Sequence, residues 1–262
     1  MSGGIELDAL YARLDDLCER ADRGELGISD FLSPAELHYA KKHLSVTKRA
    51  YICFGGYADA ERQRIYLLPE YLEEARDVSV LLEYGHSCEV CTLELVTDGY
   101  RKLTHRDYLG SLLGMGIERA VVGDILVCGD EGESAVVFCD QRISAYICEQ
   151  LARIANEKVR VRRIELDAVE VPERRFAQIC DTVASPRLDC IVAAVCSMSR
   201  EKAREAVESG IVELDFEREE RADRTVSAPC ILSVRGKGRF NIDSVGEKTK
   251  KGRYRLLAHK YL

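Results

Sequence analysis

The stretch that most constrains the fold is residues 185–212, which read SPRLDCIVAAVCSMSREKAREAVESGIV. An apolar segment, 187–196, is followed by a charged segment, 199–209, and this pattern predicts two short helices. Ser199 is a suitable cap for the second helix, and Gly210 is a suitable stop. The stretch therefore predicts a helix pair that leads directly into a sheet.

Two strands are expected after the helix pair, over 211–216 and 231–234. The second strand runs into Arg235-Gly236-Lys237-Gly238-Arg239, where two glycines lie among three cations. Glycine lets a backbone approach a sugar-phosphate chain closely, and arginine can hold a phosphate through two hydrogen bonds. This turn is a candidate phosphate-binding site, and the positive strip continues through Lys248, Lys250, Lys251, Arg253 and Arg255.

Arg200 and Arg204 are predicted to lie one turn apart on the second helix. Two cations held so close repel each other, and a phosphate between them relieves the repulsion. The interleaved acids Glu201, Glu205 and Glu208 fit a solvated helix face equally well. The helix alone therefore leaves both interpretations open.

Charge is distributed unevenly along the chain. The 262 residues carry a net charge of −7, yet residues 183–262 hold 16 Lys/Arg against 12 Asp/Glu, a net charge of +4. Residues 1–182 carry the remaining −11, and residues 233–262 hold nine Lys/Arg and two Asp/Glu. A basic end on an acidic protein is typical of a surface that binds a polyanion.

Composition places the chain among ordinary globular proteins, with 46% hydrophobic and 32% charged residues. No signal peptide and no apolar run of about 18 residues stands out, so we expect a cytoplasmic monomer that does not bind membranes. The eleven cysteines are expected to be reduced and mostly buried. Cys88 and Cys91 form a CxxC without a second ligand pair, so we expect no metal site and no cofactor.

Three segments are expected along the chain: 1–74, 75–170 and 183–262, with a linker starting at Val171-Pro172-Glu173. The first is predicted to be mainly helical, with helices from Leu7 and from Ser33-Pro34-Ala35-Glu36 and a short strand over 65–68. The fold class is therefore α+β. Strand candidates in the middle segment begin with 78–84 and 91–96.

The middle segment continues with a helix over 106–113, strands over 125–128 and 135–139, a helix over 143–154 and a strand over 159–164. From Cys91 onward the order is β-α-β-β-α-β, the split βαβ arrangement that underlies RRM domains. An RRM stacks bases on aromatic residues of its central strands, and here Phe138 is the ring on the matching strand. Phe138 could stack a base or belong to the core.

Residues 183–262 resemble the RNA-binding domain first known from the fourth small-subunit ribosomal protein, the S-four domain. The likeness rests on Arg187-Leu188-Asp189, Ser199-Arg200 with Lys202-Ala203, Gly210-Ile211-Val212 and the strand 231–234. It implies that Arg187, Ser199, Arg200, Lys202 and Arg204 face RNA and that Asp189 orients Arg187 or the helix start. The family's Val-Asn-Gly turn is Leu214-Asp215-Phe216 here, and its Gly-Asp before the later strand is Pro229-Cys230.

A second resemblance covers nearly the whole chain. Phe54-Gly55-Gly56-Tyr57, residues 104–112, Gly116-Ile117-Glu118-Arg119, residues 122–125 and the tail motifs at 238–240 and 249–253 are similar to the YlmH family. The likeness implies a bacterial-type RNA-binding protein associated with large ribosomal subunits that carry stalled peptidyl-tRNA, in rescue and quality control. An older association of the family is with cell division. Arg106 and Arg119 are expected as secondary RNA contacts.

Two other functions compete with a non-enzymatic factor that docks on structured rRNA or tRNA. One is an RNA-modifying enzyme of the pseudouridine synthase or methyltransferase type, but no catalytic or cofactor motif stands out in residues 1–182. His105-Arg106-Asp107 is not a convincing catalytic pair, because adjacent helix residues point in different directions. The other is a scaffold whose acidic N-terminal two-thirds recruits protein partners.

Overall fold

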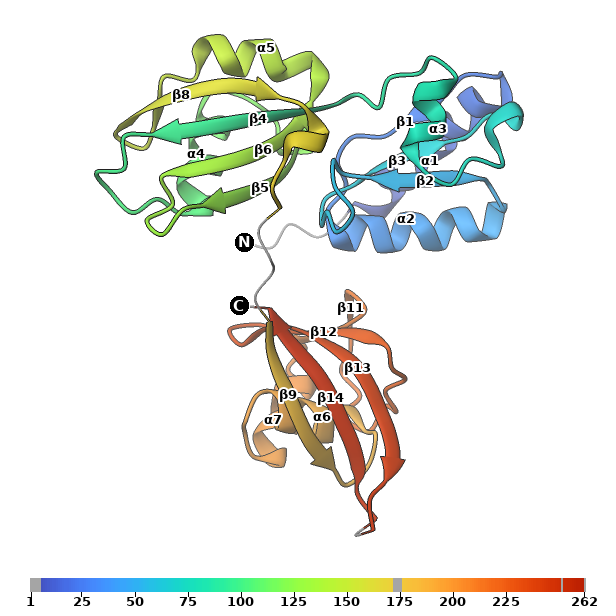
Figure 1. Ribbon diagram of the computed structural model, residues 1–262. Coiled ribbons are helices and arrows are strands. Elements are labelled where there is room, and N and C mark those ends of the chain that lie inside the picture. Colours follow the sequence, from blue (N-terminus) through green and yellow to red (C-terminus); the bar gives the residue numbers. More distant parts are fainter. Residues whose placement is uncertain (1–5, 172–175, 251, 262) are drawn as a thin grey trace. The chain divides into compact units, whose positions relative to one another are not determined.

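The computed structural model describes residues 6–171, 176–250 and 252–261. Contacts divide the chain into two compact units, residues 1–172 and 173–262 (Figure 1). The predicted division of the first unit at residue 74 stays a prediction. Within the described part of the chain, no helix is both long enough and apolar enough to span a membrane.

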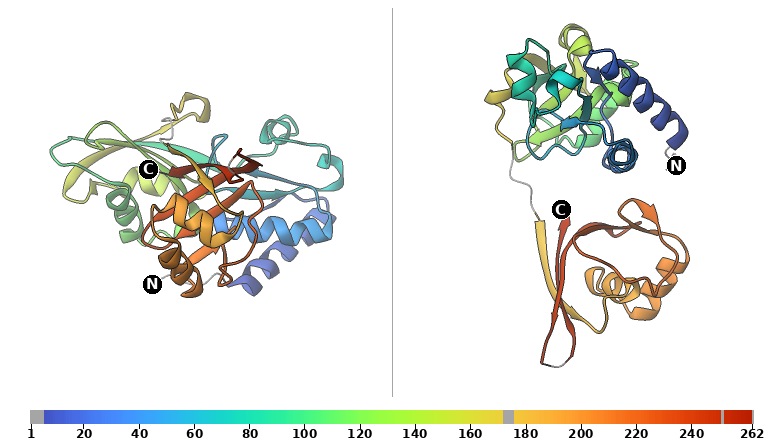
Figure 2. Two further views of the ribbon diagram at one scale, coloured as in Figure 1. Left: turned by 90° about the horizontal axis from the view of Figure 1, so that it is seen from below. Right: turned by 90° about the vertical axis from the view of Figure 1, so that its right-hand side faces the viewer.

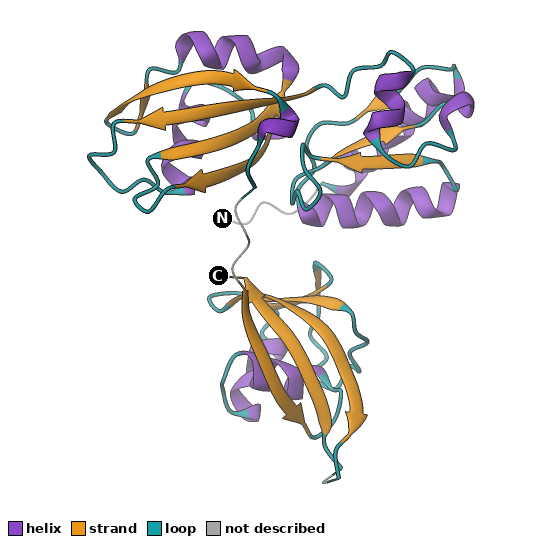
Figure 3. Cartoon of the chain, in the orientation of Figure 1, coloured by secondary structure: helices purple, strands orange, loops and turns teal. Residues whose placement is uncertain are grey.

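The first segment of unit 1 contains the expected helices and also a small sheet (Figure 3). Strands β1, β3 and β2 pair antiparallel in that order, so the segment is more mixed than its sequence suggested. The elements are α1 (Leu7–Asp22), β1 (Gly27–Ile28), α2 (Pro34–Thr47), β2 (Tyr51–Phe54), β3 (Arg64–Leu67), the 3-10 turn η1 (Glu70–Leu72) and α3 (Val78–Glu83).

Local capping explains one confirmed and one wrong prediction here. The Ser33 side chain accepts a hydrogen bond from the Glu36 amide, and the Glu36 carboxylate accepts one from the Ser33 amide, which is the predicted capping box. The strand predicted over 78–84 is instead helix α3. The Asp77 carboxylate accepts a hydrogen bond from the Ser79 amide at 2.8 Å, and this cap starts a helix in an apolar run.

The second segment of unit 1 has the predicted β-α-β-β-α-β order. Its antiparallel sheet runs β5-β6-β4-β8-β7, and the first four of these strands have the split βαβ arrangement. Helix α5 ends at Gln150 rather than at residue 154, because Arg153 and Ile154 pair with β8. The elements are β4 (Val90–Thr97), α4 (His105–Gly114), η2 (Arg119–Val121), β5 (Val122–Cys128), β6 (Ser134–Asp140), α5 (Gln141–Gln150), β7 (Arg153–Ile154), β8 (Glu157–Ile164) and η3 (Leu166–Ala168).

A buried ion pair joins the two sheets of unit 1. The Arg64 guanidinium of β3 donates to the Asp140 carboxylate at the end of β6, and both side chains are at most 3% exposed. Arg64 also donates to the carbonyls of Ser29 (2.8 Å) and Glu89 (2.7 Å). Burial raises the pKa of Asp140, but hydrogen bonds from Arg142 and Arg64 outweigh it and bring the pKa to about 2.

Unit 2 is a six-stranded antiparallel sheet with two helices on one face, as Figure 2 (right) shows. Strand β9 lies ahead of the boundary expected at residue 183 and pairs with β14 along its whole length, so it belongs to this sheet. The sheet order is β11-β10-β12-β13-β14-β9. The elements are β9 (Phe176–Val183), α6 (Leu188–Val195), α7 (Arg200–Glu208), β10 (Val212–Leu214), β11 (Glu217–Arg218), β12 (Cys230–Val234), β13 (Gly238–Lys248) and β14 (Tyr254–Tyr261).

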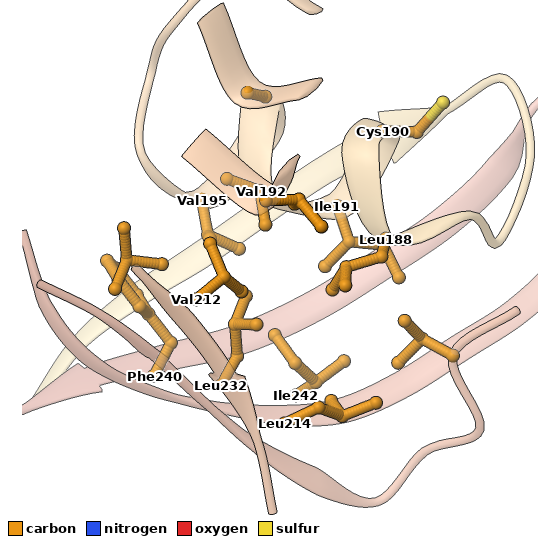
Figure 4. Close-up of a cluster of buried hydrophobic side chains, with 14 of the residues drawn as sticks. Leu188, Cys190, Ile191, Val192, Val195, Val212, Leu214, Leu232, Phe240 and Ile242 are labelled. Carbon is orange, nitrogen blue, oxygen red and sulfur yellow. The ribbon is translucent and has the colours of Figure 1, made fainter. Parts of the chain in front are cut away.

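The core of unit 2 lies between the helix pair and the sheet (Figure 4). Leu188 and Ile191 of α6 pack with Leu232, Phe240 and Ile242 of the central strands, and all five are almost fully buried. The apolar stripe of α6 that the sequence indicated therefore closes one face of the sheet and leaves the other without a helix.

Replacing Arg64 should destabilise unit 1 strongly. Arg64→Met leaves the Asp140 carboxylate buried with fewer donors, and breaking such a pair costs about 3–5 kcal/mol. Arg142→Met removes a partner of the same carboxylate whose own side chain is 69% exposed, so the loss should be about 1 kcal/mol or less. Urea unfolding compares the two variants; equal losses would contradict the buried link. Because the folded pKa of Asp140 is lowered, its contribution should be present above about pH 4 and disappear toward pH 2.

Candidate nucleic-acid interface

The carboxylate of Asp189 organises the cations at the start of the helix pair. Asp189 is 2% exposed, and its Oδ1 lies 3.1 Å from Arg187 Nε while its Oδ2 lies 2.9 Å from Arg200 Nε. Burial raises the pKa of Asp189, but hydrogen bonds from Arg187 and Arg200 lower it below its ordinary value. One carboxylate therefore fixes the positions of two guanidinium groups, one from the residue before α6 and one from the first residue of α7.

An open depression of about 510 Å³ lies beside these groups. Arg204 does not oppose Arg200 across it, because Arg204 Nε bonds Glu208 at 2.7 Å. Ser199 Oγ accepts a hydrogen bond from the Lys202 amide and so caps α7, as predicted. The charges nearly balance, since the lining residues are Arg187, Arg200, Arg204, Asp189, Glu201, Glu205 and Glu208. The helix pair is thus a mixed surface, and the repulsion expected between Arg200 and Arg204 is already relieved within the protein.

The Arg-Gly-Lys-Gly-Arg stretch forms the turn between β12 and β13. Val234 pairs with Gly238, and the Lys237 amide donates to the Val234 carbonyl at 2.9 Å. Gly236 has φ +78°, a backbone conformation that glycine adopts without strain. Arg235 and Lys237 are exposed, and neither makes an ion pair within the part of the chain that the structure describes. Arg239 lies over the Phe216 ring at 5.6 Å.

The turn between β10 and β11 keeps a tight geometry despite its unusual sequence. Asp215 and Phe216 have φ +50° and +66°, so both lie in the left-handed region that a two-residue hairpin turn requires. Asp215 Oδ1 accepts a hydrogen bond from the Ile231 amide at 2.8 Å, and the Asp215 amide donates to the Ile231 carbonyl at 2.7 Å. The acid at 215 is therefore used to hold β12 next to this turn.

The second basic group lies at the tip of the hairpin formed by β13 and β14. Lys248 pairs with Tyr254, and the Lys248 ammonium lies 5.2 Å from the centre of the Tyr254 ring. Arg253 Nε donates to Thr182 Oγ1 of β9 at 2.8 Å. Lys250 is exposed, whereas Lys251 lies outside the described residues. Figure 1 shows this hairpin at the far end of the sheet from the turn between β12 and β13.

The two basic groups are separated by the length of β13. The turn precedes Gly238 and the tip follows Lys248, so the ends of this eleven-residue strand are about 33 Å apart at about 3.3 Å per residue. The sequence suggested one positive strip, and the structure instead places the cations of 235–239 at the opposite end of β13 from Lys248, Lys250 and Arg253.

The predicted secondary contacts in unit 1 have different surroundings. Arg119 donates to the carbonyls of Val122 and Gly123, and burial followed by the nearby Arg62 charge lowers the pKa of Arg119 to about 10. The Arg119 guanidinium is therefore used for hydrogen bonds within unit 1. Arg106 is exposed in the first turn of α4, where an RNA contact remains a prediction.

Phe138 cannot act as a stacking platform, because it is fully buried. The Tyr57 ring lies 5.1 Å from it, and a Cβ added at Gly56 would come within 2.1 Å of the Phe138 ring. Of the two interpretations, core packing holds. Among the described residues, no group of three or more His, Cys, Asp or Glu side chains could hold a metal ion.

Sequence reasoning overlooked a row of cations on β8. Lys158, Arg160 and Arg162 alternate with Val159 and Val161, so the three cations share one face of the strand. The alternation of cations with valines over residues 158–162 is the sequence signal that indicates this row.

Comparisons with known proteins agree with this architecture. A family model described as "YlmH, N-terminal" matches residues 9–72, and one described as "Putative RNA-binding domain in YlmH" matches residues 89–168, together more than half of the chain. Ribosome-associated protein quality control protein P2 of Bacillus subtilis (strain 168) is 28% identical over 229 residues, which are 87% of this chain and 85% of that protein. The solved structure of cell division protein ylmH from Streptococcus pneumoniae is similar with a TM-score of 0.51 and 19% identity, over 65% of this chain and 98% of that chain. This last likeness bears on the fold alone.

Replacing Asp189 should loosen the helix pair. Asp189→Asn removes the charge that holds Arg187 and Arg200, and hydrogen bonds to charged groups contribute about 1.5–3 kcal/mol. Glu208→Gln removes the exposed partner of Arg204, so the free energy of unfolding should fall by about 0.5 kcal/mol or less. Chemical unfolding followed by a probe in unit 2 measures both changes. An Asp189→Asn variant as stable as Glu208→Gln would show that Asp189 does not organise the pair.

Proposed function

The chain belongs to the YlmH family, and on that premise we propose that it is a non-enzymatic factor that docks on structured RNA of the bacterial ribosome. Residues 173–262 would be its S-four domain and the main RNA-binding part. Its proposed target is the large subunit with peptidyl-tRNA. The name of the Bacillus subtilis relative, which places that protein in ribosome-associated quality control, supports a ribosomal partner.

The observation that carries the proposal is the position of the C-terminal cations. Arg235 and Lys237 at one end of β13, and Lys248 and Lys250 at the other, are exposed in a unit that is basic within an acidic chain. Lysine and arginine side chains that neutralise phosphates release counterions, and this term dominates non-specific affinity for nucleic acids. Because the two groups lie at opposite ends of the strand, they contact different parts of the folded RNA.

The helix pair has a different role in the proposal. Its guanidinium groups already have carboxylate partners, so RNA gains less from them than from the exposed cations of the turn. Asp189 holds Arg187 and Arg200 in fixed positions, which reduces the entropy lost when a phosphate contacts them. These residues, with Lys202 and Arg204, therefore select the shape of the RNA more than they add affinity.

The motif His105-Arg106-Asp107 could suggest a catalytic pair, but the surroundings of Asp107 favour docking over RNA modification. The Asp107 carboxylate accepts hydrogen bonds from the Thr104 amide (2.8 Å) and hydroxyl (2.6 Å) and so completes the cap of α4. Those hydrogen bonds lower the pKa of Asp107, and burial followed by the Arg119 charge lowers the pKa of His105. The Asp107 carboxylate thus serves the fold of unit 1.

Charge reversal at the turn should weaken binding to ribosomes. In the full chain, Arg235→Glu with Lys237→Glu should lower the affinity for purified bacterial large subunits at least tenfold. It should also make the dependence of log K on log salt concentration shallower by about 2, one for each lost phosphate contact. Sedimentation of the protein with subunits at several salt concentrations measures both quantities.

The matched control is Arg20→Glu with Arg23→Glu, because both arginines are exposed at the C-terminal end of α1 and the change in net charge is the same. This control should bind like the parent. Equal loss in the two variants would mean that net charge alone matters, and no loss in either would refute RNA docking by the turn. Association that survives nuclease digestion of the ribosomal RNA would favour a protein scaffold instead.

A further inference from the structure

The helix-free face of the five-stranded sheet in unit 1 carries a row of cations. Residues 158, 160 and 162 of β8 point to this face, whereas Val159 and Val161 pack against the core under the helices. Arg153 of β7 pairs directly with Lys158 and therefore lies on the same face. All four cations are exposed.

One half of this face is closed and the other half is open. Phe138 and Val136 of β6 are covered by a cluster that includes Tyr57, Leu166 and Val169. On the other half, Arg160 lies opposite Val96 of β4, and Arg162 lies opposite Glu94. The cation row thus borders the part of the sheet that the cluster leaves uncovered.

The cations of this row are accessible to a bound polyanion. Arg162 pairs with Glu94 but remains 72% exposed, and Lys158 and Arg160 make no ion pair within the described ranges. The acids of the turn between β5 and β6 are separated from β8 by β6 and β4 in the sheet order. A polyanion that follows β8 therefore meets mainly positive charge.

Strand geometry fixes the spacing of these cations. Alternate residues of an antiparallel strand lie about 6.8 Å apart, which is close to the separation of successive phosphates along an extended nucleic-acid strand. Three cations in a straight row can therefore contact consecutive phosphates of one strand. Such contacts position RNA without reading its sequence.

We propose that β8 binds one strand of RNA backbone through Lys158, Arg160 and Arg162. The inference rests on the proposed function, since it gives the same protein a second RNA contact. Phe138, the aromatic ring on the central strand, is buried in the core and cannot stack a base, so binding at this face relies on phosphate contacts.

Strand β7 pairs only with Glu157 and Lys158, so among the described residues the rest of β8 has no strand on its outer side. Charged side chains on such an edge can also serve only to prevent sheets from associating. In that case their reversal changes self-association and leaves RNA binding intact. The two roles predict opposite results in a binding experiment.

The test measures binding of oligouridylate and of large ribosomal subunits to full-length Lys158→Glu with Arg160→Glu. Affinity for oligouridylate should fall at least fivefold, and its salt slope should become shallower by about 1.4, the value for two contacts to a single strand.

The control is Arg163→Glu with Arg20→Glu, in which Arg163 lies on the same strand but on the opposite face and is also exposed. Parent-like binding by this control, with loss in the β8 variant, supports the proposal. Parent-like binding by the β8 variant overturns it, and so does equal loss in both. If the variant at 235 and 237 fails on ribosomes while the β8 variant binds normally, the proposed function stands and only this inference falls.

Discussion

The pairing of β13 with β12 on one side and β14 on the other is the constraint on which the functional arrangement depends. The residues of β13 that face the helix pair, Phe240 and Ile242, are buried in the core of unit 2. The cations must then sit where β13 ends, at the turn before Gly238 and at the tip after Lys248. A shift of register by one residue would exchange the two faces and bring charge into the core. The same pairing that stabilises unit 2 therefore sets the distance between its two basic groups.

Much of this fold follows from local signals in the sequence. Ser33 with Glu36 and Ser199 with the Lys202 amide cap helices where their spacing predicted, and the alternation over β4, β6 and β8 predicts the split βαβ order. Strand β9 was missed because its pairing partner, β14, lies about 75 residues later in the chain. Helix α3 was mistaken for a strand because a short apolar run is compatible with both.

The candidate site was harder to predict than the fold, since it depends on distances between segments far apart in sequence. The basic residues could be picked out from the sequence, but it does not show that those of 235–239 lie at the opposite end of β13 from Lys248, Lys250 and Arg253. It also could not reveal that Asp189 would accept hydrogen bonds from Arg187 and Arg200 together. Ion pairs between helices depend on crossing geometry, which residue types alone do not specify.

Unit 1 has the split βαβ order that underlies RRM domains, but Phe138, the ring on the matching central strand, is not exposed for base stacking. Gly56 and Tyr57 from the first segment cover Phe138, so the ring expected to meet bases is part of the core. Asp124 strengthens this cover, because its carboxylate accepts hydrogen bonds from the Tyr57 hydroxyl and the Glu61 amide, each at 2.7 Å. The open half of the sheet carries the charged side chains of β8, which favour contacts with the RNA backbone over contacts with bases.

Ultraviolet crosslinking of the full-length protein to large ribosomal subunits, with RNA-bearing peptides identified by mass spectrometry, tests the central claim most directly. The account predicts RNA adducts on peptides from both ends of β13, within residues 235–239 and 248–253. Adducts absent from residues 173–262 and confined to the first unit would contradict it.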